Sequence, residues 1–339
     1  MKYALLTDWH VHTEGFLSKI PTDDCLYVWD FNKARGEQAA KKYNARYEEN
    51  LEKVLADPAV DAVVIEAPTT MHTELILAAI AHGKHLFVDK PLAPTMTEAL
   101  EIKAALETSS CRFVLSLESF ISGSYRFVKD QIEAGTIGDV VSVYFRRAHG
   151  GVLHDWLPAD WYDETQMGGG VTLDLGCHGL AMLPYLCGKP TKVNAVMTQF
   201  GEKGMENNST TVVAFENNAI GTAYTSFMTT VGENFLEVIG QHGSIQVFGN
   251  PDSPTGESIW IQSDLVEAYH EKTVIDGKTL AQQPYPIEVF SALVDDPTLP
   301  SVKEYDIDAA VELTWLIEQA YRSAMKLKGI KRDNKYFAL

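Results

Sequence analysis

The sequence predicts an α/β protein in which a parallel, doubly wound sheet precedes an α+β domain with a large open, mostly antiparallel sheet. Short apolar runs alternate with helical patterns in the first third of the chain, which is typical of a parallel sheet. Near residue 138 the pattern changes to consecutive hairpins, which indicate antiparallel strands. Because 339 residues are too many for one ordinary domain, we expect two domains, 1–118 and 119–339.

The first domain is expected to have a Rossmann arrangement of short, apolar strands. Residues 62–65 (AVVI) form a continuous apolar run, the type that is buried on both faces of a sheet. The expected strands are 3–6, 26–29, 62–65, 86–88 and 113–115. The expected helices are 31–43, 49–56, 73–81 and 95–106.

The second domain begins with a long expected strand at 140–148. Asn217-Asn218 and a Gly-containing turn each separate two strand-like runs, which is a hairpin signal. These four expected strands are 210–215, 219–227, 235–239 and 244–248. A helical stretch follows Gly168-Gly169-Gly170 and continues to Leu186, and a C-terminal helix begins at Asp306 and ends near Gly329.

Composition excludes several classes of protein. The formal net charge of −18 repels polyanions, so we expect no nucleic-acid partner. No apolar run approaches the roughly 18 residues of a membrane helix, and the N-terminus does not resemble a signal peptide. The four cysteines lie far apart without a CxxC pair, as in a cytoplasmic protein with reduced thiols.

The strongest local signal lies at the ends of two expected strands, in the segments 66–72 (EAPTTMH) and 83–91 (GKHLFVDKP). In a parallel sheet, ligands bind beyond the carboxyl ends of the strands. Lys90 directly follows a buried strand, and Pro91 restricts the backbone beside it. Next to a nicotinamide, the Lys90 ammonium could bind a substrate hydroxyl and help to move its proton. The alternative is a surface lysine at the start of a loop.

A second candidate pair is Asp174 and His178. On a helix, residues four apart share a face, and a carboxylate there can orient an imidazole and raise its basicity. Such a pair suits a general base near neutral pH. The alternatives are an ordinary helix pair without chemistry, or a buried histidine that the aspartate satisfies.

Asp30 ends the second expected strand, about 20 residues after the first turn, where a dinucleotide fold places the acid that binds the ribose hydroxyls. The alternative is an aspartate that caps the next helix. Lys33 and Arg35 are near enough to accommodate a 2′-phosphate instead. We therefore expect NAD or NADP, with NAD slightly favoured.

The first turn, 7–15 (TDWHVHTEG), lacks the G-x-G-x-x-G pattern, and Asp8 has the wrong charge to face a phosphate. Its Asp8-x-His10-x-His12 pattern is similar to the metal-binding opening of PHP-type phosphoesterases and amidohydrolases. The other histidines follow no barrel pattern, and the hairpins argue against a (β/α)₈ barrel. We expect no metal, and a metal-dependent hydrolase stays as an alternative.

Four segments, in this order, resemble the Gfo/Idh/MocA family (glucose-fructose oxidoreductase / inositol dehydrogenase-like). They are 67–91, 133–140, 168–181 and 310–329, so the resemblance covers nearly the whole chain. It implies NAD(P)-dependent hydride transfer to or from a secondary alcohol of a sugar, inositol or related polyol. It also implies an NAD(P)-binding domain, a substrate-binding domain, and a homodimer or homotetramer formed through the C-terminal sheet.

By this resemblance Lys90 is the active-site lysine, His178 the proton-transferring histidine and Asp174 its partner. The expected cofactor-binding residues are Thr7, Asp8, Asp30, Ala67, Pro68, Thr69, His72, Asp89, Lys90 and Glu118. The chain departs from the family at its first turn and at three further positions, where it has Glu118, Phe120 and Ala181. A non-catalytic ligand-binding relative that has lost the cofactor is therefore a further alternative.

Overall fold

The computed structural model describes the chain except for residues 203, 233, 251–255 and 327–339. The chain forms two compact units, each built from separate segments. The first unit comprises Met1–Leu117, Thr165–Met167 and Pro284–Trp315. The second comprises Glu118–Glu164, Gly168–Gln283 and the chain from Leu316.

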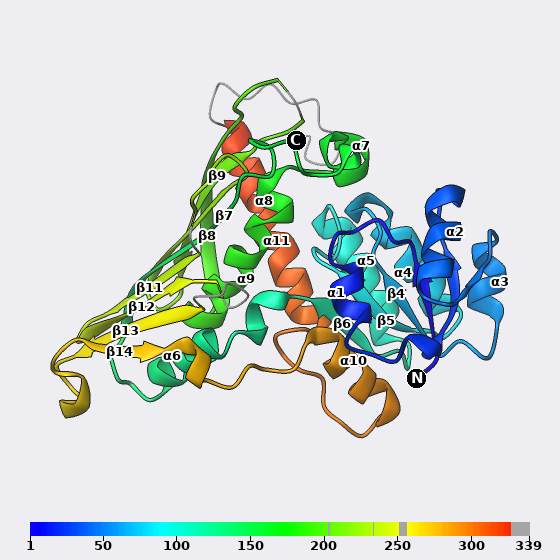
Figure 1. The fold of residues 1–339 in the computed structure, drawn as a ribbon. Helices are drawn as coiled ribbons and strands as arrows, with labels where there is room; N and C mark the ends of the chain where they lie inside the picture. Colours follow the sequence, from blue (N-terminus) through cyan, green and yellow to red (C-terminus); the bar gives the residue numbers. More distant parts are fainter. Residues whose placement is uncertain (203, 233, 251–255, 327–339) are drawn as a thin grey trace. The chain divides into compact units, whose positions relative to one another are not determined.

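The described part of the first unit contains a six-stranded parallel sheet in the order β3-β2-β1-β4-β5-β6 (Figure 1). The strands are β1 (Tyr3–Leu6), β2 (Cys25–Trp29), β3 (Arg46–Tyr47), β4 (Ala62–Ile65), β5 (His85–Asp89) and β6 (Phe113–Ser116). Every residue of β1, β4 and β6 is buried, which explains their continuous apolar sequences. The predicted Rossmann arrangement is confirmed, and its strand order reverses between β1 and β4, where such sheets bind ligands.

Helices of the first unit begin at polar capping residues. The side chains of Asn32, Asn50 and Thr95 each accept a backbone N–H at the start of the next helix. Two helices therefore begin two residues later than the apolar pattern indicated. The helices are α1 (Thr13–Leu17), α2 (Lys33–Lys42), α3 (Leu51–Ala56), α4 (His72–Ala81), α5 (Met96–Glu107) and α10 (Pro286–Asp295).

Helix α10 comes from far along the chain, yet it packs on the parallel sheet. The ring of Phe290 lies 5.8 Å from that of Phe87 on β5. The backbone N–H of Leu115 on β6 donates to the carbonyl of Tyr305, at 2.9 Å. A pattern read along the chain cannot reveal this return, because nothing in residues 284–315 indicates which sheet they cover.

The described part of the second unit contains an eight-stranded sheet in the order β14-β13-β12-β11-β7-β10-β9-β8. Its strands are β7 (Val140–Ala148), β8 (Pro190–Thr198), β9 (Asn208–Phe215), β10 (Ile220–Ser226), β11 (Phe235–Gly240), β12 (Gly243–Gly249), β13 (Glu257–Ser263) and β14 (Thr273–Asp276). Strands β7 and β10 pair in parallel, and the other pairs are antiparallel. The predicted mostly antiparallel sheet is confirmed, including both hairpins, whereas β8, β13 and β14 were not expected.

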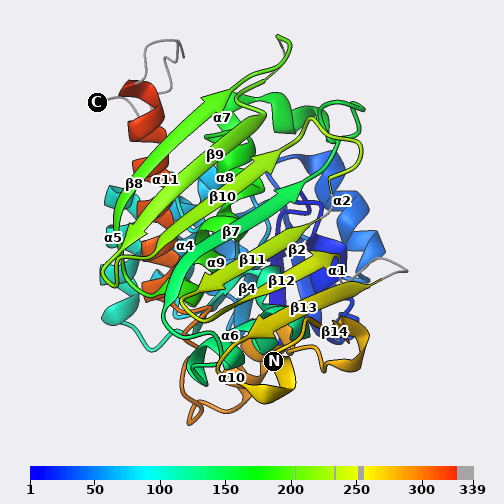
Figure 2. The same cartoon turned by 90° about the vertical axis from the view of Figure 1, so that its left-hand side faces the viewer.

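Helices cover one face of this sheet. They include α6 (Gly123–Glu133), α8 (Val171–Asp174), α9 (Gly176–Cys187) and the part of α11 (Ile307–Lys326) that belongs to this unit. The opposite face, turned to the viewer in Figure 2, carries none of the helices that the structure describes. The sheet is therefore open on one side, as the sequence predicted.

The helix expected to run from the glycine triplet to Leu186 is instead broken. Helix α8 ends at Asp174 and α9 begins at Gly176, with Leu175 between them. The break falls directly before a glycine, a residue of low helix propensity. Asp174 and His178 therefore belong to two short helices, and the expectation that one continuous helix carries both is wrong.

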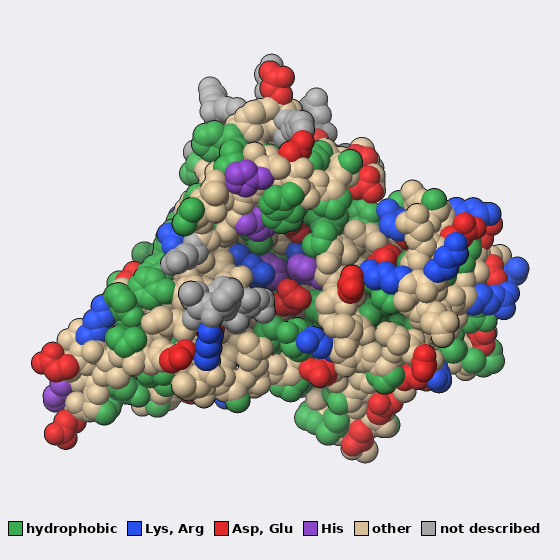
Figure 3. Space-filling view, in the orientation of Figure 1, with side chains coloured by type: hydrophobic (Ala, Val, Ile, Leu, Met, Phe, Trp, Pro, Cys, Tyr) green, Lys and Arg blue, Asp and Glu red, His purple; other side chains and the backbone are tan. Residues whose placement is uncertain are grey.

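Two surface properties can be stated for the described residues. No helix among them is both long enough and apolar enough to cross a membrane. Over α2 and α3, basic side chains outnumber acidic ones, and both kinds are visible on that surface in Figure 3.

Candidate active site

All of the site residues predicted in the first unit lie at the carboxyl edge of its parallel sheet. Thr7 and Asp8 follow β1, Asp30 follows β2, Ala67–Thr69 follow β4, and His72 begins α4; Asp89 ends β5 and Lys90 follows it. The prediction of Lys90 and Asp30 as strand-end residues depended only on where apolar runs stop, and those ends are correct.

Lys90 is buried, with 4 % of its surface exposed, so the surface-lysine alternative does not hold. A chain of hydrogen bonds fixes its backbone: its N–H donates to Oγ of Ser116 (3.2 Å), and that hydroxyl donates to Oδ1 of Asp89 (2.5 Å). The Lys90–Pro91 peptide bond is cis. Lysine is almost never buried unless its ammonium has a partner or a task, which makes Lys90 a candidate for chemistry.

The turn after β1 has, at Thr7, a left-handed backbone conformation that glycine usually adopts. Thr7 has φ of 67°, is completely buried, and donates its N–H to the carbonyl of Trp29 at 2.7 Å. A β-branched residue is strained in this left-handed conformation. Trp9 and His10 are buried in the same turn, where glycines would leave space for a pyrophosphate.

His10 joins this turn to the end of β5. Its Nε2 lies 3.2 Å from Oδ2 of Asp89, and its Nδ1 accepts the backbone N–H of His12 at 3.3 Å. Potential metal-ligand atoms of His10, His12 and Asp89 lie within 4.8 Å of one another. A neutral ring that accepts at Nδ1 carries its proton at Nε2, directed at Asp89. This hydrogen bond satisfies both groups without a metal ion.

Asp8 is not an isolated charge in the folded chain. Burial raises the pKa of its carboxyl group, and the Lys42 ammonium and Tyr43 hydroxyl partly offset that rise. The hydroxyl donates to Oδ1 at 3.2 Å, and the ammonium lies 3.9 Å from Oδ2. The Lys42 ammonium therefore counters part of the negative charge that this turn would present to a phosphate.

Asp30 is almost completely buried and already accepts four hydrogen bonds. Arg35 donates from Nε and Nη2, each at 2.8 Å, and the backbone N–H groups of Asn32 and Asp8 donate at 2.7 and 3.2 Å. The side chain of Asn32, rather than Asp30, caps α2. The guanidinium of Arg35 also lies 4.6 Å from the centre of the Phe31 ring.

His72 ties two loops of the predicted cofactor site together. It is fully buried, with Nε2 2.9 Å from the carbonyl of Ala67 and Nδ1 3.0 Å from that of Pro91. Burial lowers the pKa of its imidazole, and these carbonyls partly offset the effect. Its side chain joins the loops after β4 and β5, so it stabilises the two loops that carry the predicted cofactor contacts.

In the second unit, His178 lies buried on α9 and meets two residues that the sequence did not point to. Its Nδ1 is 3.0 Å from Oγ of Ser119, and Nη1 of Arg147 donates to the same oxygen at 3.3 Å. Ser119 follows Glu118, the first residue of the 3₁₀ helix Glu118–Ile121. These residues come from separate elements, so no local motif could have revealed them.

Asp174 and the glycine triplet form hydrogen bonds with other residues of the second unit. Oδ2 of Asp174 accepts from the Trp161 indole at 3.4 Å. The buried Glu206 carboxylate accepts the N–H groups of Gly170 (3.1 Å) and Thr172 (3.4 Å), and it also accepts from the Tyr321 hydroxyl. Glu206, which the sequence analysis missed, thereby holds the start of α8 in place.

Two sequence models of one family match the chain. The model described as "Oxidoreductase family, NAD-binding Rossmann fold" matches residues 5–117, and the "GFO/IDH/MocA C-terminal domain" matches residues 125–246. The chain belongs to the Gfo/Idh/MocA family. This membership confirms the resemblance and, at the level of the family, the prediction of an NAD(P)-dependent oxidoreductase that acts on CH–OH groups.

Gfo/Idh/MocA relatives match most of the chain. A scyllo-inositol 2-dehydrogenase (NAD(+)) of Bacillus subtilis is 27% identical, over 95% of this chain and 94% of the relative. A levoglucosan dehydrogenase of Pseudarthrobacter phenanthrenivorans is 25% identical, over 66% of this chain and 71% of its own. A levoglucosan dehydrogenase structure with NADH and levoglucosan has the same fold, with a TM-score of 0.80, 19% identity and coverage of 96% and 97%. These relatives support neither alternative, the metal-dependent hydrolase or the non-catalytic binding protein.

Proposed function

We propose that this Gfo/Idh/MocA enzyme transfers a hydride between NAD and a secondary alcohol carbon of a sugar, inositol or related polyol. The observation that carries the proposal is Lys90, a buried lysine at the carboxyl end of β5 in a Rossmann sheet. The inositol and sugar dehydrogenases among its relatives support the substrate class.

We assign the proton chemistry to Lys90, His178 and Asp174. When the alcohol is oxidised, its carbon loses a hydride, its oxygen loses a proton, and a C=O bond forms. The Lys90 ammonium binds the reacting oxygen, and His178 accepts the proton that this oxygen loses, or returns it in the reverse reaction. Asp174 supports His178 from the adjoining helix. The bound nicotinamide ring supplies the hydride acceptor or donor.

The cofactor contacts follow the carboxyl edge of the sheet. We assign Asp30 to the ribose hydroxyls, which would replace one of its present hydrogen-bond donors, and Glu118 to the nicotinamide end. The other assigned contacts are Thr7, Asp8, Ala67, Pro68, Thr69, Asp89 and Lys90, with His72 holding Ala67 in place. The sheet order and the position of Asp30 suit a dinucleotide, whereas the side chains of Trp9 and His10 narrow the phosphate turn. We propose no metal at His10, His12 and Asp89.

We propose NAD rather than NADP. A 2′-phosphate would need Arg35, and this guanidinium is bound to both oxygens of Asp30. Direct titration of the purified protein should give tighter binding of NADH than of NADPH. In Asp30→Ala, Arg35 becomes available, and the preference should move toward NADPH. Tighter NADPH binding by the unaltered protein would contradict the proposal.

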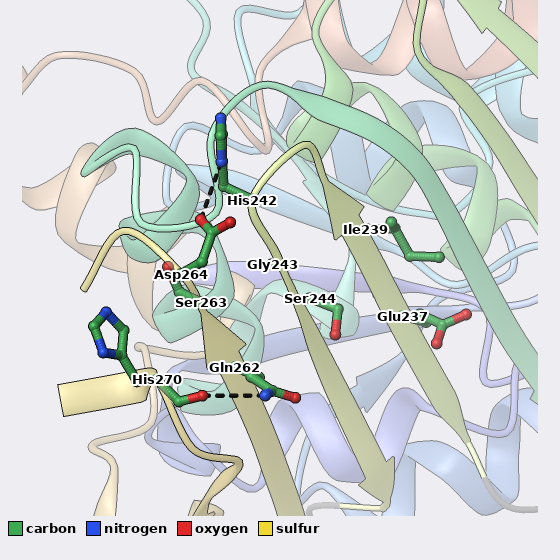
Figure 4. Close-up of a pocket in the computed structure, with 9 residues that line it drawn as sticks. All are labelled: Glu237, Ile239, His242, Gly243, Ser244, Gln262, Ser263, Asp264 and His270. Carbon is green, nitrogen blue, oxygen red and sulfur yellow. Dashed lines mark hydrogen bonds and ion pairs between the residues drawn. The ribbon is translucent and has the colours of Figure 1, made fainter. Parts of the chain in front are cut away.

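We also propose a cytoplasmic homodimer or homotetramer assembled through the open face of the eight-stranded sheet. Strand register places exposed apolar side chains together on that face, namely Val196, Val212, Ile220, Ile239 and Val274. Figure 4 shows a polar pocket on the same face, in which His242 pairs with Asp264 at 3.0 Å. An apolar area with a polar margin is typical of a subunit interface.

The experiment for the proposed activity is a screen of inositols, sugars, anhydrosugars and their keto forms. Nicotinamide absorbance reports reduction of NAD by the alcohols and oxidation of NADH by the ketones. At least one polyol should support turnover that depends on added cofactor. If no nicotinamide cofactor binds at millimolar concentration, the non-catalytic alternative replaces this proposal.

A further inference from the structure

Ser119 and Arg147 form a small network with His178 that none of the family motifs contains. We infer that Ser119 is a positioning residue which, held by Arg147, fixes His178 in the neutral tautomer with its proton on Nε2. This inference rests on the proposed function only where it concerns turnover. The tautomer itself follows from the hydrogen bonds of the second unit.

The network is buried and built from three separate elements. Ser119 belongs to the 3₁₀ helix after β6, Arg147 to β7 and His178 to α9. Ser119 and His178 have only 6 % and 1 % of their surface exposed. With its Oγ 3.0 Å from Nδ1 and 3.3 Å from Nη1 of Arg147, the hydroxyl joins the ring to the guanidinium.

The direction of each hydrogen bond follows from what each group can donate. A guanidinium has donors only, so the oxygen of Ser119 accepts from Arg147. Among the described residues, Nδ1 of His178 is the acceptor that the structure gives the hydroxyl proton of Ser119. The hydroxyl therefore donates to Nδ1, and a neutral ring that accepts at Nδ1 carries its own proton at Nε2.

Arg147 strengthens this arrangement in two ways. A hydroxyl that accepts from a cation becomes a better donor, because hydrogen bonds in a chain polarise one another. A guanidinium one hydrogen bond away also disfavours a second positive charge on the ring. Protonation at Nδ1 would turn that nitrogen into a donor and leave the Ser119 proton without its acceptor.

The consequence is a neutral His178 ring whose Nε2 is a hydrogen-bond donor and not an acceptor. Such a group polarises a carbonyl and suits the direction in which NADH reduces a ketone. Alcohol oxidation through Nε2 requires the Ser119 hydroxyl to rotate first, so that Nδ1 can carry the proton.

The direct test is nitrogen-15 NMR of the histidine rings in the full-length protein at a pH above the usual histidine range. His178→Gln identifies the His178 signals. The expected result is a proton on Nε2 and a hydrogen-bonded, unprotonated Nδ1. In Ser119→Ala the Nδ1 signal should move toward that of a free ring nitrogen, and Ser119→Thr should restore it. A wild-type ring protonated on Nδ1 would overturn the inference, whether or not any polyol is turned over.

Turnover provides the second readout. Loss of one buried hydrogen bond is worth about 1 kcal/mol, so Ser119→Ala should lower kcat for ketone reduction about fivefold to tenfold with KM nearly unchanged. Ser119→Thr should recover most of that loss. Arg147→Met frees the hydroxyl to rotate and should lower kcat in the same way as Ser119→Ala, whereas Arg147→Lys retains the cation and should keep most of the activity. If Ser119→Thr is as impaired as Ser119→Ala, the hydroxyl has no positioning role.

Discussion

At the scale of single residues, Thr7 adopts a backbone conformation that favours glycine. Its φ is 67°, and for a β-branched side chain this conformation costs roughly 1–3 kcal/mol. The sequence predicted that the glycines of the family's first turn are missing, but not that Thr7 is left-handed there. The residue type gave no indication of this angle, because threonine rarely adopts it.

The catalytic candidates also divide into residues that the sequence revealed and residues that it did not. Lys90 was found from sequence because it follows the apolar run 86–88 with only Asp89 between them, and burial then distinguished it from a surface lysine. Ser119 and Arg147 were missed because packing of separate elements, rather than spacing along the chain, brings them to His178. Strand ends can be predicted from a sequence, whereas contacts across a folded unit cannot.

His85 makes stability depend on pH. Its Nδ1 accepts the backbone N–H of Arg112 at 2.8 Å, and burial lowers the pKa of its imidazole. Below about pH 6.5, His85 therefore binds a proton more readily in the unfolded chain than in the folded chain. Above that pH both states are neutral and this contribution is constant.

We expect the free energy of unfolding to fall below pH 6.5 by up to about 1.4 kcal/mol per pH unit from this one group. His85→Asn keeps an acceptor near Nδ1 but does not titrate, so urea denaturation from pH 5 to 8 should show a shallower fall. The exposed His270→Asn is the control and should leave the slope unchanged. Equal slopes in all three proteins would contradict this explanation.

At the scale of elements, apolar periodicity placed most strands and helices of the first unit correctly. Errors arose where a polar group decides the boundary, as at the caps Asn32 and Asn50, or where glycine interrupts a helix, as at Gly176. The helix break was invisible because the apolar pattern continues through Leu175. Helix caps and breaks depend on single residues, so a period averaged over a window misses them.

Glu206 provides a test of how the start of α8 is held. Its buried carboxylate accepts from two backbone N–H groups, and hydrogen bonds to a charged group contribute about 1.5–3 kcal/mol. Glu206→Gln should lower the free energy of unfolding by about 2 kcal/mol and reduce kcat, because α8 carries Asp174. Glu202→Gln, the same change at an exposed position, should have little effect on either. Chemical denaturation and steady-state kinetics measure both, and an unchanged Glu206→Gln would show that the carboxylate is dispensable.

At the scale of the whole molecule, the sequence predicted two sheets of different kinds but not the way the chain returns to the first one. Residues 284–315 belong to the parallel-sheet unit, although they follow most of the second unit in the sequence. The single boundary after residue 118 cannot represent this, because a boundary read along the chain assumes that each domain is continuous.

The open sheet face predicts an assembly that can be tested directly. Val212 lies on that face and is exposed in the single chain. Val212→Asp would bury a charge in the proposed interface, so light scattering should show a smaller species at micromolar concentration. Exposed Val231→Asp, which lies outside the strands, is the control and should keep the wild-type mass. A wild-type protein that is monomeric would contradict assembly through the sheet.

The central claim is that Lys90 takes part in nicotinamide-dependent chemistry, and turnover by Lys90→Met measures it most directly. With a polyol that the wild type oxidises, the variant should lose about 10²–10⁴-fold in kcat, the usual contribution of a positioned acid–base group. Its circular dichroism spectrum should stay close to that of the wild type, and it should still bind NADH, with an affinity lowered only by the loss of one cofactor contact. Turnover within a fewfold of wild type, with the fold and cofactor binding intact, would contradict the account.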